Sequence, residues 1–131
     1  MKTRKNGLYP RLFYRTPAEF SVEFYIMKYK RRNVAHLSGK KGLGQGQDIG
    51  EGGLSFVSPY LLPVDMIVRL AVELPETGVE RMLARVVRSE RFSGGYLTGV
   101  QFFNLANTRQ ERIRNFVVSQ AKKQYKFLRY L

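Results

Sequence analysis

The chain contains no cysteine, only one histidine and no long apolar run. The absence of cysteine excludes a disulfide framework, thiolate metal sites and a cysteine nucleophile, and it favours the cytosol. No apolar run approaches the roughly 20 residues that cross a bilayer. Residues 1–14 also lack the apolar centre of a signal peptide. We therefore predict a cytoplasmic protein without a membrane span.

Groups for catalysis are equally scarce. The single histidine is His36, and no obvious carboxylate or nucleophile partner accompanies it in the sequence. The ten acidic residues form no enzyme-like pair, and metal-ligand spacing is absent. We interpret His36 as a surface or strand residue. The chain is predicted to be a binding module, not an enzyme, with no metal and no resident cofactor.

The charge is strongly one-sided. A length of 131 residues suits one domain with a real core. Lysine and arginine number 23 against 10 acidic residues, which gives a net charge of +13. Residues 1–41 hold 11 basic and 2 acidic residues, a net of +9. This excess favours an anionic partner such as nucleic acid, a phosphate-bearing ligand, an acidic protein or a membrane surface, although solvation of the surface explains most single lysines equally well.

Apolar residues repeat with a period of two in several segments, which is typical of half-buried strands. The predicted strands are residues 19–29, 66–74, 79–90 and 96–103. In the first, alternate residues from Phe20 to Ile26 share one side. Turn sequences at Pro75 to Gly78 and Ser93 to Gly95 separate the later strands. Short strands without alternating helices predict an antiparallel sheet or small barrel.

The period changes to that of a helix near residue 108. Thr108 and Glu111 form a capping-box pattern, and Asn107 is an alternative cap. One stripe of the helix comprises Ile113, Phe116, Val117, Gln120, Tyr125 and Leu128. We predict a C-terminal helix over about residues 108–131 that packs as a lid on one barrel end or on a partner. A nucleic-acid recognition helix is the less favoured alternative.

Seven of the twelve glycines lie in residues 39–53. A P-loop would need lysine and then serine or threonine after its last glycine, and a dinucleotide fingerprint would need glycine in place of Gln47. Neither pattern fits. Glycine permits close backbone approach, so a bulged strand or a ligand-facing loop stays open. For Gly39 to Gly46 we favour a mobile surface loop.

Two short motifs follow one another in a distinctive order. Arg11 and Arg15 precede the first predicted strand, and Asp48-x-Gly50-x-x-Gly53 follows about thirty residues later in "DIGEGGLSF". The strand "YLTGVQF" then precedes the predicted helix. This order resembles the PilZ domain family, bacterial receptors for the second messenger cyclic di-GMP. The family signatures are an RxxxR arm and a [D/N]xSxxG turn on a six-stranded antiparallel barrel.

The resemblance implies a mainly β fold, a six-stranded antiparallel barrel with a C-terminal helix. Residues 1–18 would form a basic arm, and residues 19–131 a single domain. The ligand implied is cyclic di-GMP, with a downstream protein partner and a role in the regulation of motility, adhesion or exopolysaccharide. The implied ligand-binding residues are Arg11, Arg15, Asp48, Gly50 and Gly53. Gly50 departs from the pattern, which has serine there.

The chemistry of these residue types suits such a ligand. A guanidinium binds phosphate or the O6/N7 edge of guanine through two donors, and it stacks on the base. The carboxylate of Asp48 can accept from guanine N1–H and the exocyclic amine, while Gly53 lets the backbone turn sharply. We expect the ligand to order the arm and so to expose or cover a surface that a partner reads.

Other interpretations stay open. The glycine at position 50 allows a degenerate PilZ adaptor that binds no nucleotide. Aromatic and basic residues interleave between Phe13 and Tyr29, so a small basic β-barrel that binds single-stranded nucleic acid is also possible, but less favoured. Phe20 and Phe24 weaken it because they share the apolar side of their strand. Local ion pairs or turn hydrogen bonds are the alternatives for each arginine and for Asp48.

Overall fold

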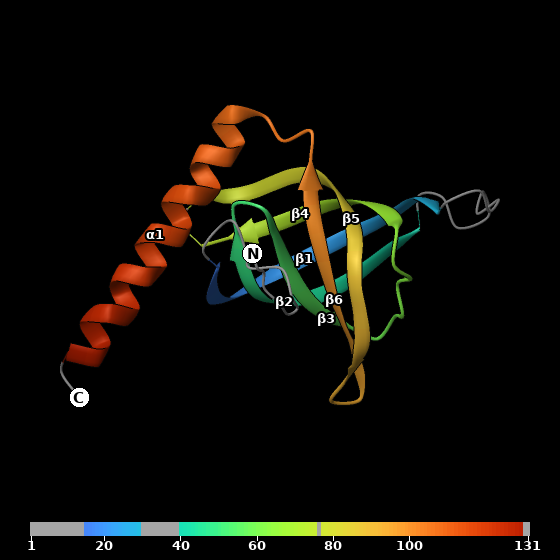
Figure 1. Ribbon diagram of the computed structural model, residues 1–131, viewed down its shortest axis with the longest axis horizontal. Coiled ribbons are helices and arrows are strands. Elements are labelled where there is room, and N and C mark those ends of the chain that lie inside the picture. The colour runs from blue at the N-terminus through green and yellow to red at the C-terminus, as the bar shows by residue number, and fades with distance from the viewer. Residues whose placement is uncertain (1–14, 30–39, 76, 130–131) are drawn as a thin grey trace, which may run out of the picture.

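The computed structural model describes residues 15–29, 40–75 and 77–129. The side chains of residues 28, 29 and 124–129 are outside this description, and so are the predictions made for Arg11 and His36. Figure 1 shows the elements, which are β1 (Arg15–Tyr29), β2 (Lys41–Gly50), β3 (Gly53–Ser58), β4 (Met66–Leu74), β5 (Gly78–Phe92), β6 (Gly95–Phe103) and α1 (Asn107–Arg129).

The six strands form a closed barrel in the order β1-β2-β3-β6-β5-β4. Every neighbouring pair is antiparallel, and β1 completes the circle because it pairs with both β2 and β4. Among the six described strands, closure therefore gives every strand a neighbour on both sides. The predicted six-stranded antiparallel barrel with a C-terminal helix is confirmed.

The strand predictions differ from the structure mainly at their ends. The strand predicted at residues 66–74 has the bounds of β4. In contrast, β1 begins at Arg15, four residues before the predicted start at Glu19. The register of β1 against β2 shifts between Pro17 and Phe20. Because this bulge interrupts the period of two, residues 15–18 carry no regular strand pattern.

The two-residue turn between β5 and β6 follows from local chemistry. Ser93 and Gly94 have φ values of 49° and 85°, as a tight hairpin with right-handed strand twist requires. At the other end of β6, the chain enters α1 at Asn107. Asn107 and Thr108 therefore both lie inside the first helical turn. Neither is the cap, because the carbonyl oxygen of Ala106 accepts the first helical hydrogen bond, from the amide of Gln110.

The core fills the barrel and continues into the helix. The alternate residues of β4 are all buried, namely Met66, Val68, Leu70, Val72 and Leu74. Ile113, Phe116 and Val117 of α1 belong to the same hydrophobic cluster. The first half of α1 lies against one end of the barrel, and the rest of the helix extends past it (Figure 1). The helix is therefore a lid on one barrel end, as predicted.

The glycines of β2 make room for aromatic rings. Gly42 pairs with Phe24 and Gly46 pairs with Phe20 across β1 and β2. A Cβ atom on Gly42 or Gly46 would lie 2.2 Å from the ring opposite it. The predicted mobile loop is therefore wrong for residues 41–46, which lie within β2. The bulged-strand alternative is correct, since the register of β2 against β3 shifts between Gly46 and Asp48.

Substituting Gly46 by alanine should lower the free energy of unfolding by about 1–3 kcal/mol, because the added methyl group overlaps the Phe20 ring. Urea denaturation measures the loss. The double variant Gly46→Ala/Phe20→Leu should be less destabilised than the sum of its single variants. Gln45→Ala, an exposed neighbour on β2, is the control and should change stability by less than about 0.5 kcal/mol. Equal losses in Gly46→Ala and Gln45→Ala would contradict this packing.

Candidate functional site

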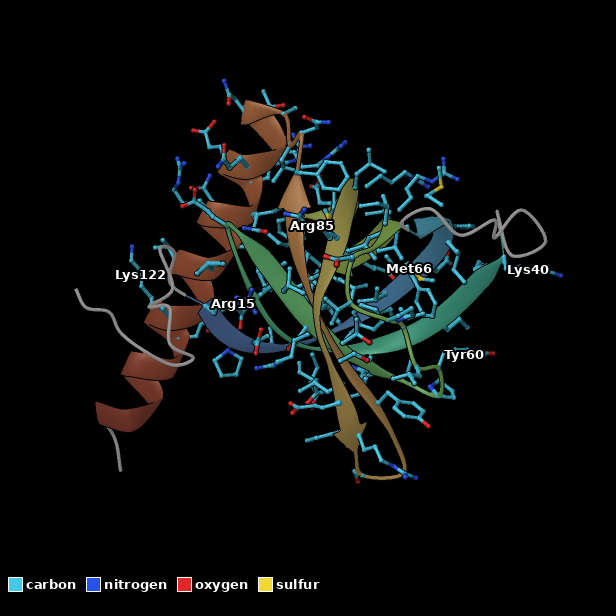
Figure 2. The ribbon with its side chains drawn as sticks, turned by 45° about the vertical axis from the view of Figure 1, so that its right-hand side comes forward. Arg15, Lys40, Tyr60, Met66, Arg85 and Lys122 are labelled. Carbon is cyan, nitrogen blue, oxygen red and sulfur yellow. The ribbon has the colours of Figure 1, made fainter. Side chains whose placement is uncertain are left out.

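Four of the five predicted ligand residues come together at the barrel end that α1 covers. Arg15 opens β1 and pairs in register with Gly50, the last residue of β2. Asp48 pairs with Pro17 on the same two strands, and Gly53 opens β3. Figure 2 shows Arg15 at this end of the barrel, with Lys40 and Met66 at the opposite end. Arg11, the fifth, is outside the described residues.

The Arg15 guanidinium lies between a carboxylate and a glycine backbone. Its Nη1 atom is 3.3 Å from Oδ1 of Asp48, and the two side chains are 17% and 26% exposed. A Cβ atom on Gly53 would lie 2.9 Å from Nη2 of Arg15 and 2.0 Å from the carbonyl oxygen of Val100. A side chain at position 53 would therefore collide with the backbone of β6 and with the guanidinium. Glycine is required there for space.

The turn between β2 and β3 is fixed to the barrel by buried side chains and by a backbone hydrogen bond. Ile49 and Leu54, which flank the turn, are fully buried. The amide of Phe102 donates to the carbonyl oxygen of Gly52 at 2.9 Å. These contacts tie the turn to β6, so a ligand would meet an already folded turn.

A shallow hollow lies on the strands that carry Arg15 and Asp48. Its volume is about 550 Å³, and it occurs where the bulges of β1 and β2 meet. The lining residues are Pro17, Ala18, Glu19, Gln45, Gly46 and Gln47. The hollow is therefore near the ion pair along both strands, but Arg15, Asp48, Gly50 and Gly53 are not among the residues that line it.

The motif turn also contacts α1 through Glu51, which sequence reasoning missed. Nε and Nη2 of Arg114 donate to Oε1 and Oε2 of Glu51 at 2.8 and 3.0 Å. This two-point hydrogen bonding holds the pKa of Glu51 below its usual range, against the opposing effect of burial. The partners lie 63 residues apart in sequence, so no local sequence pattern predicts the pair.

A second ion-pair cluster fixes the start of α1 to β5. The side chain of Glu80 is 3% exposed. It accepts from Nε and Nη2 of Arg112 at 2.8 and 3.0 Å and from Nε of Arg109 at 3.1 Å. Glu80 is in phase with the buried residues Met82 and Ala84 of β5, and an acidic residue on an apolar face requires a partner. The position of Glu80 on the apolar side of the strand was therefore the sequence signal that could have predicted a buried ion pair.

Among residues 15–29, 40–75 and 77–129, no three histidine, aspartate or glutamate side chains gather as a metal-binding group. No helix within those ranges combines the length and hydropathy needed to cross a membrane. The rim of the barrel at this end carries the guanidinium of Arg15, the carboxylate of Asp48 and the glycine-rich turn at residues 50–53. Together these groups provide hydrogen-bond donors and acceptors for a ligand.

Comparison with known proteins identifies relatives of this arrangement. The sequence profile described as "PilZ domain" matches residues 9–119. No curated protein matches the chain. Among solved structures, the PilZ domain of YcgR from Escherichia coli with c-di-GMP is 13% identical, with a TM-score of 0.67, and the alignment covers 92% of this chain and 98% of that one.

Two longer proteins contain the same fold. The Bacillus subtilis inhibitor of motility (MotI/DgrA) is 16% identical with a TM-score of 0.71, and the alignment covers 87% of this chain and 52% of that one. The MrkH–c-di-GMP complex of K. pneumonia is 16% identical with a TM-score of 0.70, covering 89% and 55%. The chain thus spans about half the length of these two proteins. At such identities the similarity concerns the fold.

The Glu80 cluster predicts a pH dependence of stability. The hydrogen bond from Arg112 is the largest influence that lowers the pKa of Glu80 from its ordinary value of 4.5. A lowered pKa in the folded state stabilises the fold above pH 4.5, and this contribution is lost as the pH falls through the lowered value. Glu80→Gln should therefore lower the free energy of unfolding by about 1–3 kcal/mol at pH 7. The stability of this variant should also depend less on pH between 6 and 3.

Denaturation of wild type and variant across this pH range measures both effects. Glu90→Gln is the control, because the Glu90 side chain is 55% exposed and its contact with Arg88 is 3.8 Å. This control should keep the pH slope of the wild type. An unchanged slope in Glu80→Gln would show that the buried carboxylate is not the titrating group.

Proposed function

Because the chain belongs to the PilZ domain family, we propose that it is a bacterial cytoplasmic receptor that binds cyclic di-GMP at the rim formed by Arg15, Asp48, Gly50 and Gly53. One observation carries this proposal. Arg15 and Asp48 are 33 residues apart in sequence and are in contact at 3.3 Å, beside the glycine backbone at position 53. YcgR and MrkH, of the same fold, have been solved with c-di-GMP, which supports the choice of ligand.

Each residue has a role that its chemistry suits. Cyclic di-GMP carries two phosphates and two guanines. Arg15 binds a phosphate or the O6/N7 edge of a guanine, and Arg11 supplies a second guanidinium. Asp48 accepts from guanine N1–H and the exocyclic amine. Gly53 keeps the wall of the site free of a side chain. The resulting module is a receptor and not an enzyme.

The glycine at position 50 removes a hydroxyl group that the family pattern provides. Gly50 still pairs with Arg15 across the strands, so the backbone at this position remains next to the guanidinium. The site loses a hydrogen bond worth about 0.5–1.5 kcal/mol, which lowers the affinity for the ligand without abolishing binding. A degenerate adaptor without nucleotide binding is the second candidate, and Gly50 is the observation that favours it.

Binding of single-stranded nucleic acid receives less support from the described residues. Phe20 and Phe24 are buried at 4% and 2% exposure, so neither can stack on a base. Tyr25 has its ring under the guanidinium of Arg69, at 5.1 Å from the centroid. Phe13 and Tyr14, also named for this interpretation, are outside the described residues.

The signal is proposed to leave through the N-terminal arm, residues 1–18. Arg15 to Ala18 of this segment lie in β1. Ligand binding at Arg15 and Arg11 changes the conformation of the arm, and a downstream protein partner reads the change. Control of motility or exopolysaccharide is the regulated process we propose, and the name of the Bacillus inhibitor of motility supports the first.

Isothermal titration calorimetry with cyclic di-GMP should show saturable binding that weakens at least about tenfold in Arg15→Ala, a loss of about 1.4 kcal/mol. GTP and a short single-stranded DNA serve as comparators and should not saturate. Arg69→Ala is the matched control, because Arg69 is an exposed arginine on β4 that pairs in register with Tyr25. It should bind like the wild type.

The calorimetry separates the candidates. No heat with cyclic di-GMP at high micromolar concentration would favour the adaptor. Heat with the DNA alone, falling steeply as salt increases, would favour the nucleic-acid binder. Equal losses in Arg15→Ala and Arg69→Ala would contradict the placement of the site.

Limited trypsin proteolysis tests the response of the arm. Saturating cyclic di-GMP should slow cleavage after Arg11 and the basic residues that precede it, because bound Arg11 is withdrawn from the protease. Arg15→Ala at the same ligand concentration should show little protection. Equal cleavage of the wild type with and without ligand would contradict the arm response even if calorimetry showed binding.

A further inference from the structure

The turn that carries the glycine motif is joined to α1 by one ion pair. Glu51 lies between Gly50 and Gly52, and both oxygens of its carboxylate accept from Arg114. The Glu51 side chain is 16% exposed although it belongs to a surface turn. A pair with two parallel hydrogen bonds sets orientation as well as distance. The helix therefore holds this turn in one position.

The turn needs such a restraint because of its composition. Three of the four residues from Gly50 to Gly53 are glycine, and glycine loses more conformational freedom on ordering than any other residue. The amide of Phe102 fixes one carbonyl oxygen of the turn, and Arg114 fixes its only side chain. Without Arg114, the turn would retain fewer contacts to limit its movement.

Besides its apolar packing, α1 is attached to the barrel by two groups of ion pairs among the described residues, and these groups contact different parts of the barrel. Arg109 and Arg112 bind Glu80, which lies within β5. Arg114 binds Glu51, which lies within the motif turn. Both attachments hold the helix on the rim, but only the second contacts the segment that contains the ligand residues. The pairs with Glu80 therefore anchor the helix, whereas the pair with Glu51 can also position the motif turn.

We propose that Glu51 and Arg114 are positioning residues for the ligand site, so that docking of α1 and the affinity for cyclic di-GMP are coupled. This inference rests on the proposed function. The docked helix holds the Gly50–Gly53 turn in its binding geometry, which spares the ligand the entropy of ordering that turn. By reciprocity the ligand strengthens the docking of the helix by the same factor. The helix thereby becomes a second output of the receptor, in addition to the arm.

The test combines calorimetry with hydrogen exchange. Arg114→Ala and Glu51→Gln should each lower the affinity for cyclic di-GMP about three- to tenfold, as expected for one partly exposed ion pair. The double variant should be no weaker than either single variant, because both remove the same pair. The charge-reversed double variant, Glu51→Arg with Arg114→Glu, should recover part of the affinity. Recovery would show that the two residues act on the ligand site through their mutual pairing, and no recovery would contradict this.

Arg112→Ala is the matched control. It removes a similar two-point ion pair from the same helix without contacting the motif turn, so its ligand affinity should stay within about twofold of the wild type. Equal weakening in Arg112→Ala and Arg114→Ala would overturn the proposal, since general loosening of the helix would then explain both. Unchanged or tighter binding in Arg114→Ala would overturn it as well.

Hydrogen exchange of the ligand-free protein distinguishes failure of this inference from failure of the proposed function. Arg114→Ala should speed exchange of the amides of residues 50–53 about three- to tenfold, whereas Arg112→Ala should leave them unchanged. Unchanged exchange in Arg114→Ala would overturn the positioning role whether or not the ligand binds. Faster exchange in a protein whose wild type shows no heat with cyclic di-GMP would instead reject the receptor function and keep the link between helix and turn.

Discussion

The pairing of β1 with β2 is the interaction on which the rest of the structure depends. Phe20 and Phe24 of β1 fit against Gly46 and Gly42 of β2, and this match of large and absent side chains permits one alignment of the strands. A slip of one residue would turn the rings out of the core. Beyond the register shift between Pro17 and Phe20, the same pair of strands places Arg15 opposite Gly50 and brings its guanidinium to Asp48. The motif residues therefore meet through two features of this strand pair, the core packing that aligns β1 with β2 and the bulge that shifts the register ahead of Phe20.

The helix completes this arrangement at the rim. Its apolar side chains extend the core, while arginines on its first turns bind Glu80 and Glu51 at two places on the barrel. Glu80 is a buried carboxylate whose two arginine partners compensate its desolvation. Glu51 belongs to the motif turn itself. A lid that is held partly by the motif turn cannot be structurally independent of it. In the proposed receptor, this geometry would connect nucleotide binding to the helix.

Much of the fold could be predicted from the sequence, but the details of the site only in part. The alternation in β4 specified its bounds and its buried face, since each apolar residue has a fixed side in a strand. The same rule failed in β2, because Gly42, Gly44 and Gly46 have no side chains to alternate, and their role depends on rings from another strand. The start of β1 was missed because a bulge breaks the period at Pro17. Motif spacing brought Arg15, Asp48, Gly50 and Gly53 into one hypothesis. The pair of Glu51 and Arg114 had no such signal, because charged residues on turns and helix faces usually only contact solvent.

We propose that cyclic di-GMP binds at the β1–β2 rim beneath the first half of α1. A titration followed by amide chemical shifts in nuclear magnetic resonance tests this most directly, because it maps contact without altering a residue. We expect the largest shifts at Arg15, at residues 48–53 and in the part of α1 around Arg114. Shifts centred on the exposed arginines of β5, such as Arg81 and Arg85, or no shifts at saturating ligand, would contradict it.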